Sequence, residues 1–301
     1  MSFKLDSELN ENQIESDVAS YLGYVTPLWS RRFRLISVDE QTTGADKLFR
    51  RFIPIYLQFK VSQGLNPKAN ILERYRKYPL ANIIKYRKRN ELGGNPILYF
   101  QLRRMANRAT DFQHNILFRL NNQPNQFALY IAPLTLELDE YEKLMNQDWY
   151  RRFLPYEPFN SRNSEIFDSS FGRSFDLGTN PFLRHHISIP PHKITNTHKH
   201  HYSYSKSGGN VAWHGGETLE NDYRLSNQIS KILNYANERK DFGINQRSYI
   251  NFINEFERKN SVFYNDEYDS NENPFERIFE FTRKLKAEHQ IHTMFLSYYE
   301  K

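Results

Sequence analysis

The sequence predicts an α/β (α+β) protein with a central mixed sheet flanked by helices and a helical C-terminal part. Two patterns carry this prediction. Apolar, β-prone runs separated by turn residues recur through the first two thirds of the 301 residues, and helical spacing dominates beyond Gly215-Gly216. We therefore expect one domain at 1–205, with a basic insertion at about 66–95, and a helical region at 206–301.

The individual elements follow from local patterns. Residues 8–22 carry an apolar stripe at helical spacing that ends at Gly23, which predicts a first helix. Later helices are indicated by Leu225, Ile229 and Leu233, and by the apolar positions that follow Asn273-Pro274, a typical cap-and-start pair. Strands are expected at 33–38, 48–52, 53–62, 97–102, 127–132, 185–189 and 202–204.

The composition narrows the function classes. The chain contains no cysteine, which excludes disulfides, thiolate nucleophiles and cysteine zinc sites, and fits a cytoplasmic location. No apolar run approaches the roughly 18 residues of a membrane span, and the start lacks the features of a signal peptide. A net charge of +6 and a pI near 9.2 favour an anionic partner.

The stretch 44–60 carries the most specific chemistry. Asp46 follows a glycine turn, and Gln58 and Lys60 lie two residues apart near the end of a β-prone run, so that both point to the same face of a strand. If Asp46 lies on the neighbouring strand of a hairpin, the three side chains meet. A carboxylate, an amide oxygen and an ammonium would then surround a metal ion and a phosphate.

Phosphodiester hydrolysis needs such a set. Mg²⁺ or Mn²⁺ activates water and neutralises the phosphate, oxygen ligands hold the ion, and a cation steadies the developing charge. Asp46 would supply a carboxylate, Gln58 an auxiliary oxygen and Lys60 the cation. The backbone carbonyl of Phe59 is another possible oxygen ligand. A second carboxylate would come from Glu15, on the same helix face as Glu11, or from Glu40.

Asp46 followed by Gln58-Phe59-Lys60 resembles the PD-(D/E)xK nuclease superfamily, whose fold is restriction-endonuclease-like. The pattern of that family is a first-helix glutamate, an aspartate, and (Asp/Glu)-x-Lys on the next strand. The resemblance assigns Glu15 as the helix acid, with Gln58 in place of the second acid, as in Gln-x-Lys variants. It implies a metal-dependent endonuclease, with DNA favoured as substrate. It also implies a link to phage defence, with a homo-oligomer or a partner protein.

A basic segment follows the motif. Eight Lys or Arg residues lie between Asn66 and Glu91, and two more follow the next predicted strand. Basic residues interleaved with tyrosines suit contacts to phosphates and bases, although a solvated helical surface explains them equally well. The candidate nucleic-acid contacts are Lys68, Arg74, Arg76, Lys77, Lys85, Arg87, Lys88, Arg89, Arg103 and Arg104.

Other interpretations remain open on the sequence alone. The run His198-Lys199-His200-His201 has a spacing that fits zinc, but neighbouring lysines and the lack of nearby acids oppose a cation. His114 is more typical of a packed histidine than of a catalytic one. The alternative function is a non-catalytic nucleic-acid-binding or assembly subunit on the same scaffold, which Gln58 favours. A basic face that recognises another protein is the third possibility.

Overall fold

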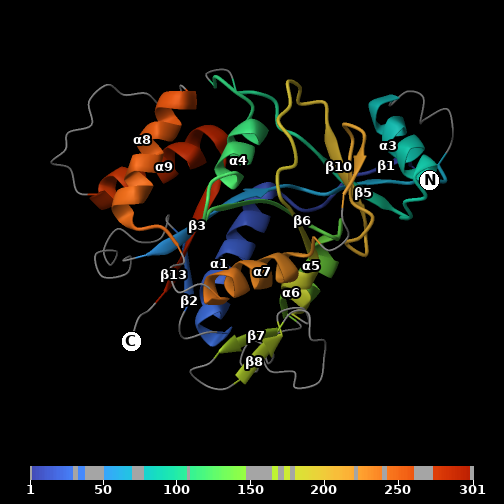
Figure 1. The fold of residues 1–301 in the computed structure, drawn as a ribbon. Coiled ribbons are helices and arrows are strands. Elements are labelled where there is room, and N and C mark those ends of the chain that lie inside the picture. The colour runs from blue at the N-terminus through green and yellow to red at the C-terminus, as the bar shows by residue number, and fades with distance from the viewer. Residues whose placement is uncertain are drawn as a thin grey trace.

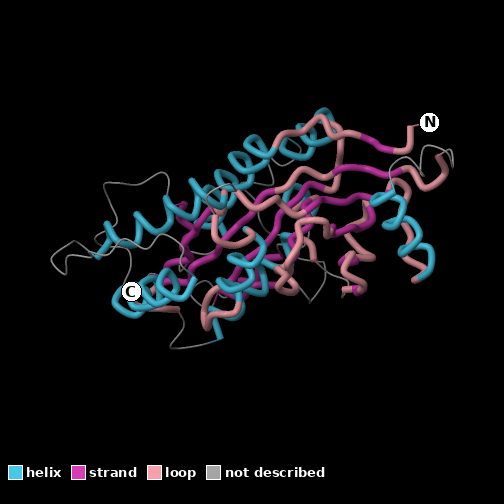
Figure 2. The backbone as a smooth tube through the Cα atoms, turned by 90° about the horizontal axis from the view of Figure 1, so that it is seen from above, coloured by secondary structure: helices cyan, strands magenta, loops and turns pink. Residues whose placement is uncertain are grey.

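A computed structural model describes most of the chain and shows a mixed α+β fold with two main sheets (Figure 1). The described residues are 2–29, 33–37, 51–69, 78–106, 109–146, 165–168, 173–176, 180–219, 223–238, 243–260 and 274–298. Seen from above, the molecule is elongated, with helix α3 at one end and helices α8 and α9 at the other (Figure 2).

Most of the described helices pack on a five-stranded sheet with the order β2-β13-β3-β6-β9. Neighbouring strands are antiparallel except for β3 and β6, which are parallel. The sheet is therefore mixed, as the sequence predicts. Its strands are β2 (Phe33–Ser37), β3 (Phe52–Phe59), β6 (Phe127–Pro133), β9 (His186–Ile189) and β13 (His292–Tyr298).

A six-stranded antiparallel sheet continues from the first one, with the order β1-β4-β5-β10-β11-β12. The chain passes from one sheet to the other at residues 60–62, between β3 and β4. A separate hairpin pairs β7 (Glu165–Asp168) with β8 (Arg173–Asp176). The strands of the second sheet are β1 (Lys4–Leu5), β4 (Gln63–Leu65), β5 (Ile97–Gln101), β10 (His201–Ser205), β11 (Ala212–Trp213) and β12 (Glu217–Thr218).

Helices cover both faces of the five-stranded sheet. One apolar core joins α1, α5, α6 and α7 to one face, and a second joins α4, α8 and α9 to the other face and to the second sheet (Figure 1). Helix α3 packs on the second sheet through a smaller core. The helices are α1 (Glu11–Trp29), α3 (Tyr78–Arg89), α4 (Gln113–Asn121), α5 (Leu138–Asn146), α6 (Pro181–Arg184), α7 (Leu225–Glu238), α8 (Gln246–Asn260) and α9 (Pro274–His289).

Strand β3 is the central strand of the five-stranded sheet, and all eight of its residues are buried. Both faces of the strand meet helices, which explains a continuous apolar run rather than an alternating one. Pro54 lacks a backbone N–H and lies opposite Phe295 of β13, just before β6 joins at Ile55. The neighbours of β3 are therefore β13 and β6. The segment with Asp46, which the sequence analysis places on a neighbouring hairpin strand, lies outside the described residues.

The C-terminal region is not only helical. Strand β13 pairs with β2 from Tyr298↔Phe33 to Met294↔Ser37, and with β3 on its other side. The domain boundary expected at residue 205 falls at the end of β10. Strand β10 pairs with β11, so this boundary would separate two neighbouring strands of one sheet. The segment expected to form a separate helical part thus supplies a central strand of the sheet.

Most expected elements are present, but the first helix continues past Gly23, where the sequence predicts its end, to Trp29. The first helix, the strands near 33–37, 53–59, 97–101 and 127–133, and the helices after Leu225 and Pro274 all form. The C-terminal helix begins at Pro274, as the cap-and-start pair indicates. Helix α8 is not among the expected elements. Residues 48–50 lie outside the described residues.

No helix within the described ranges is both long and apolar enough to cross a membrane.

The position of β13 leads to a stability prediction. Leu296 is fully buried in the core shared with α1 and lies between β2 and β3. We expect Leu296→Ala to lower the free energy of unfolding by about 2–5 kcal/mol, because the cavity adds to the lost transfer energy. Urea denaturation measures this change.

The matched control is Leu138→Ala at the start of α5, where the side chain is 38% exposed. We expect this change to cost about 0.5 kcal/mol or less. Equal effects of the two substitutions would contradict the central placement of β13.

Candidate active site and basic cleft

The candidate site lies where the two sheets meet, at the end of β3. Gln58 is fully buried, and Lys60 immediately follows the strand with 6% of its surface exposed. The two residues lie on the same side, as their spacing predicts. They reach a carboxylate of the first helix, but this carboxylate belongs to Glu11 rather than Glu15.

Glu11 lies in the first turn of α1 and contacts both motif residues. The Nε2 atom of Gln58 donates to Glu11 Oε1 over 3.1 Å, and Lys60 Nζ lies 3.6 Å from the same oxygen. Burial lowers the pKa of Lys60, the charge of Glu11 opposes this shift, and nearby Arg103 adds to the lowering. Glu11 therefore stabilises the charged form of a lysine in a poorly solvated position.

Glu15, the acid expected from the sequence, has other partners. Its carboxylate forms an ion pair with Lys286 of α9 and lies 3.5 Å from His292 Nδ1 at the start of β13. A spacing of four residues keeps two side chains on one helix face but moves the second one turn along the axis. The assignment of Glu15 to the Gln58–Lys60 site is therefore wrong, and Glu11 is its correction.

Both polar atoms of the Gln58 amide are hydrogen-bonded. Its Oε1 accepts from Gln113 Nε2 of α4, and its Nε2 donates to Phe59 O over 3.0 Å as well as to Glu11. The amide nitrogen thus lies between a carboxylate oxygen and a backbone carbonyl, the two oxygens that a hard cation would use. To act as an oxygen ligand, Gln58 would have to exchange its contact with Gln113.

The donor set fits a Mg²⁺ or Mn²⁺ ion in part. Glu11 and the Phe59 carbonyl supply two oxygens, and no cluster of three or more acidic or histidine ligands occurs in the described part of the chain. A second carboxylate must come from elsewhere. Asp46 and Glu40, the two candidates from the sequence, lie outside the described residues.

A cleft of about 830 Å³ opens from this site along the junction of the sheets. It is bounded by the start of α3, the end of β5 and the start of β10. Glu11 is the one carboxylate among the described residues that line it. The cationic side chains lining it are Lys4, Lys60, Arg103, Arg104 and Lys199.

Arg103 and Arg104, two of the candidate nucleic-acid contacts, line this cleft. Arg104 is exposed, whereas one guanidinium nitrogen of Arg103, Nη1, is buried without a hydrogen-bond partner among the described residues. A buried N–H group without a partner carries a desolvation cost that an incoming anion relieves. This cleft is therefore suited to an anionic ligand.

The basic residues of the segment 66–91 differ in their exposure to solvent. Lys68, Lys85, Lys88 and Arg89 are exposed, the last three on α3. Arg74, Arg76 and Lys77 lie outside the described residues.

Arg87 is a correction to the predicted binding surface. It is 1% exposed, and its guanidinium donates to Ser203 Oγ over 3.0 Å and to the carbonyls of Asn210 and Gly93. Burial lowers its pKa to about 10. This arginine joins α3 to the second sheet and cannot reach an external phosphate.

Three consecutive buried polar residues open helix α4, and together they contact β3, β6 and the segment 190–200. Gln113 donates to Gln58 and to the carbonyl of His289, while His114 Nδ1 lies 2.8 Å from Tyr130 Oη and His114 Nε2 2.7 Å from Lys193 O. Asn115 Nδ2 donates to Thr195 O, and Asn115 Oδ1 accepts from Thr195 N, both over 2.9 Å.

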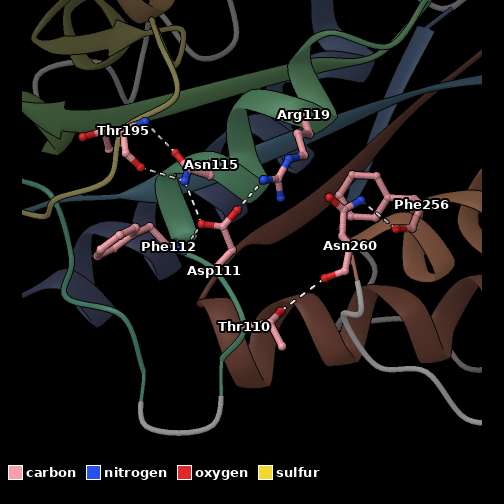
Figure 3. Close-up of polar contacts among 8 residues, drawn as sticks. All are labelled: Thr110, Asp111, Phe112, Asn115, Arg119, Thr195, Phe256 and Asn260. Atoms are coloured by element: carbon pink, nitrogen blue, oxygen red, sulfur yellow. Dashed lines mark hydrogen bonds and ion pairs between the residues drawn. The ribbon is translucent and has the colours of Figure 1, made fainter.

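Figure 3 shows how this helix start is fixed. Asp111 accepts from Phe112 N and from Asn115 Nδ2, each over 2.7 Å, and forms an ion pair with Arg119, one turn beyond Asn115. The Asn115 amide faces Thr195 in the segment 190–200, which carries His198 and Lys199 to the cleft. The cleft wall is therefore tied to the same helix that holds Gln58.

Sequence reasoning preferred Glu15 to Glu11 and missed Gln113 as a residue of the site. Glu11 had a signal, because it shares a helix face with Glu15. Gln113 had none, since its contact with Gln58 depends on the packing of α4 against β3. The expectation that His114 is packed is confirmed, because its ring stacks between Tyr130 and Trp213. The histidines near 198–201 form no metal-binding group with other described residues.

Comparison of the chain with protein-family models gave no match, and neither curated proteins nor solved structures showed significant similarity to it.

The buried histidines predict an acid-labile fold. Burial lowers the pKa of His114 to about 4, below the value near 6.5 of an unfolded histidine. Its stabilising contribution is complete above about pH 6.5 and is lost as the pH falls towards 4, because the unfolded chain takes up the proton first. The same direction applies to His186, His201, His214 and His289.

We expect His114→Gln to reduce the slope of unfolding free energy against pH between about 6 and 4.5. The variant takes up one proton fewer when it unfolds, which lowers the slope of unfolding free energy against pH by about 1.4 kcal/mol per pH unit. Urea titrations at several pH values measure this slope, which is independent of any stability lost at neutral pH. An unchanged slope would show that His114 is protonated equally in both states.

Proposed function

We propose that the protein is a metal-dependent nuclease that binds the nucleic-acid backbone in the basic cleft and hydrolyses it beside Glu11 and Lys60. The observation that carries this proposal is the contact between these two side chains at the end of the cleft. Glu11 from the first helix lies 3.6 Å from Lys60 Nζ and within hydrogen-bond distance of Gln58. A helix acid beside Gln-x-Lys is the arrangement that the PD-(D/E)xK pattern implies.

The cleft suits a phosphate backbone because its lining is strongly cationic. Arg103, Arg104 and Lys199 lie on its walls, and Lys60 lies near Glu11. Arginine forks bind phosphate oxygens through two N–H groups, and each lysine adds a point charge. The substrate would thus extend along the sheet junction, with one phosphate near Lys60. DNA is the proposed substrate.

The residues divide the chemistry as follows. Glu11 and the Phe59 carbonyl would hold Mg²⁺ or Mn²⁺, with Asp46 as the proposed further carboxylate. When bound, the ion lowers the pKa of a water ligand and neutralises phosphate charge. Lys60 stabilises the negative charge that develops on the phosphate oxygens. Its burial suits this role, because a cation in a poorly solvated position interacts more strongly with charge.

We predict that Glu11→Gln and Lys60→Met each lower Mg²⁺- or Mn²⁺-dependent cleavage of a labelled DNA duplex by at least about 100-fold. Each substitution removes one charge of the proposed catalytic pair while preserving side-chain size. Cleavage rates under single-turnover conditions are the measurement. Thermal unfolding and DNA binding in EDTA establish that the variants remain folded.

Two comparisons sharpen this test. Glu15→Gln examines the acid expected from the sequence, and we expect a smaller loss because Glu15 contacts Lys286 instead of Lys60. Glu142→Gln, on the exposed side of α5, controls for loss of an acidic charge alone. Full cleavage by both Glu11→Gln and Lys60→Met would rule out this site.

The second candidate function is a non-catalytic nucleic-acid-binding subunit, and the state of Gln58 favours it. The amide is neutral, and its nitrogen donates into the space between Glu11 and the Phe59 carbonyl. A hydrogen-bond donor there satisfies both oxygens without a metal ion. Salt-sensitive binding by the native protein without metal-dependent cleavage would support this candidate over the nuclease.

Both candidates share a binding prediction. We expect Arg104→Ala combined with Lys199→Ala to weaken binding of labelled DNA at least tenfold in low salt. The slope of log affinity against log salt should fall by about two, one for each lost phosphate contact. Fluorescence anisotropy in EDTA measures both quantities.

Lys231→Ala is the matched control, since this exposed lysine lies on α7, on the far side of the five-stranded sheet from α4. Affinity and salt slope that stay unchanged in the double variant would show that the cleft does not bind nucleic acid.

A further inference from the structure

A second hollow lies one helical turn from the first site, on the α1 face of the five-stranded sheet. It has a volume of about 370 Å³. Glu15, Ser37 and His292 line it together with Asn12 and Lys286. They come from four elements, α1, β2, β13 and α9, which meet where β2 ends and β13 begins.

Three of these side chains form a chain of contacts. Ser37 Oγ lies 3.0 Å from His292 Nε2, and His292 Nδ1 lies 3.5 Å from Glu15 Oε1. A hydroxyl on one ring nitrogen and a carboxylate on the other is the geometry in which histidine acts as a base towards serine. The distance to Glu15 is long for a hydrogen bond, as is common in the absence of substrate.

We propose that Ser37, His292 and Glu15 form a nucleophilic serine site that takes the acyl group of a small carboxylic ester. The site is separate from the nuclease proposal, because it shares neither Glu11 nor Lys60. The proposal rests on the contacts and on the hollow, which gives the serine space for a reacting carbonyl.

The fold holds the base rigidly. His292 is 4% exposed, its ring packs edge-on against Phe59, and it pairs with Leu57 in the ladder between β13 and β3. Ser37 pairs with Met294, two residues further along β13. Side chains two residues apart on a strand share a face, so the ladder itself places His292 beside Ser37.

Lys286 adds two features. Its ammonium contacts the Glu15 carboxylate and holds it near the histidine ring. It also lines the hollow, where a cation stabilises the oxyanion of an attacked carbonyl. Glu15 and Lys286 are thus positioning and charge-stabilising groups, whereas Ser37 and His292 carry the reaction.

The reaction is balanced as follows. Ser37 Oγ attacks the ester carbonyl while its proton passes to His292 Nε2. The carbon–oxygen bond to the leaving group then breaks, and the leaving alkoxide takes that proton as an alcohol. Water subsequently hydrolyses the acyl-serine by the same route in reverse, releasing the carboxylic acid and restoring the serine.

A fluorophosphonate probe tests the site directly on the full chain. The serine oxygen forms a bond to phosphorus, fluoride leaves, and the serine proton is lost with it. We expect a single adduct by intact mass, located on Ser37 by peptide mapping. Hydrolysis of 4-nitrophenyl acetate should be lost in the same variants that lose labelling.

The variants separate chemistry from folding. Ser37→Ala should abolish labelling, and His292→Gln should slow it at least about 100-fold. Ser20→Ala is the matched control, because Ser20 lines the hollow without contacting His292 in the structure. Glu15→Gln should slow labelling at least tenfold, and Glu15→Asp should recover part of the rate, which a merely structural role would not produce.

Absence of an adduct on the native chain, under conditions that label an established serine esterase, would overturn the proposal. An adduct that persists in Ser37→Ala would overturn it as well. Thermal unfolding of Ser37→Ala distinguishes loss of the nucleophile from loss of the fold. The result is independent of DNA cleavage, so failure of either proposal leaves the other standing.

Discussion

The candidate nuclease site depends on one buried amide. Gln58 has no exposed surface, and its two polar atoms join three elements: Glu11 of α1, Gln113 of α4 and the backbone of β3 itself. An unpaired amide in this position would cost about 1–3 kcal/mol. The amide therefore fixes the position of Glu11 relative to Lys60. The same residue that weakens a metal site, because it carries no charge, keeps the carboxylate and the ammonium together.

The start of helix α4 extends this constraint to the wall of the cleft. Gln113, His114 and Asn115 are adjacent in sequence and all buried, which is unusual for three polar residues in a row. Their hydrogen bonds reach β3, β6 and the segment 190–200, and thereby set the distances between these three parts of the chain. Satisfied buried polar groups specify one arrangement where apolar contacts would allow several. The motif residue Gln58 and the segment that carries Lys199 are thus held by the same helix.

Local patterns predict much of this fold because they depend on local physics. Strand β3 is recognisable as a continuous apolar run, and α9 begins at Pro274 because proline suits the first helical position. Helix α8 carries Tyr249, Ile253 and Phe256 at helical spacing, and this apolar periodicity is itself typical of a helix.

The remaining features depend on contacts that sequence order does not express. Strand β13 lies between β2 and β3 although some 230 residues or more separate it from either, and its own sequence carries no sign of its partners. Arg87 counts as one more positive charge in a basic run until α3 packs on the second sheet and buries it. Which of Glu11 and Glu15 reaches Lys60 depends on where the first turn of α1 lies relative to the end of β3, and the sequence does not specify this position.

The insertion of β13 explains why two sites lie so close together. Its first residue, His292, faces the hollow with Ser37, whereas Gln290, two residues earlier, lines the basic cleft. On helix α1, Glu11 likewise lines the cleft, and Glu15, one helical turn further along, lines the hollow. Lys286 interacts with both acids: it forms an ion pair with Glu15, while burial lowers its pKa and the charge of Glu11 opposes that lowering.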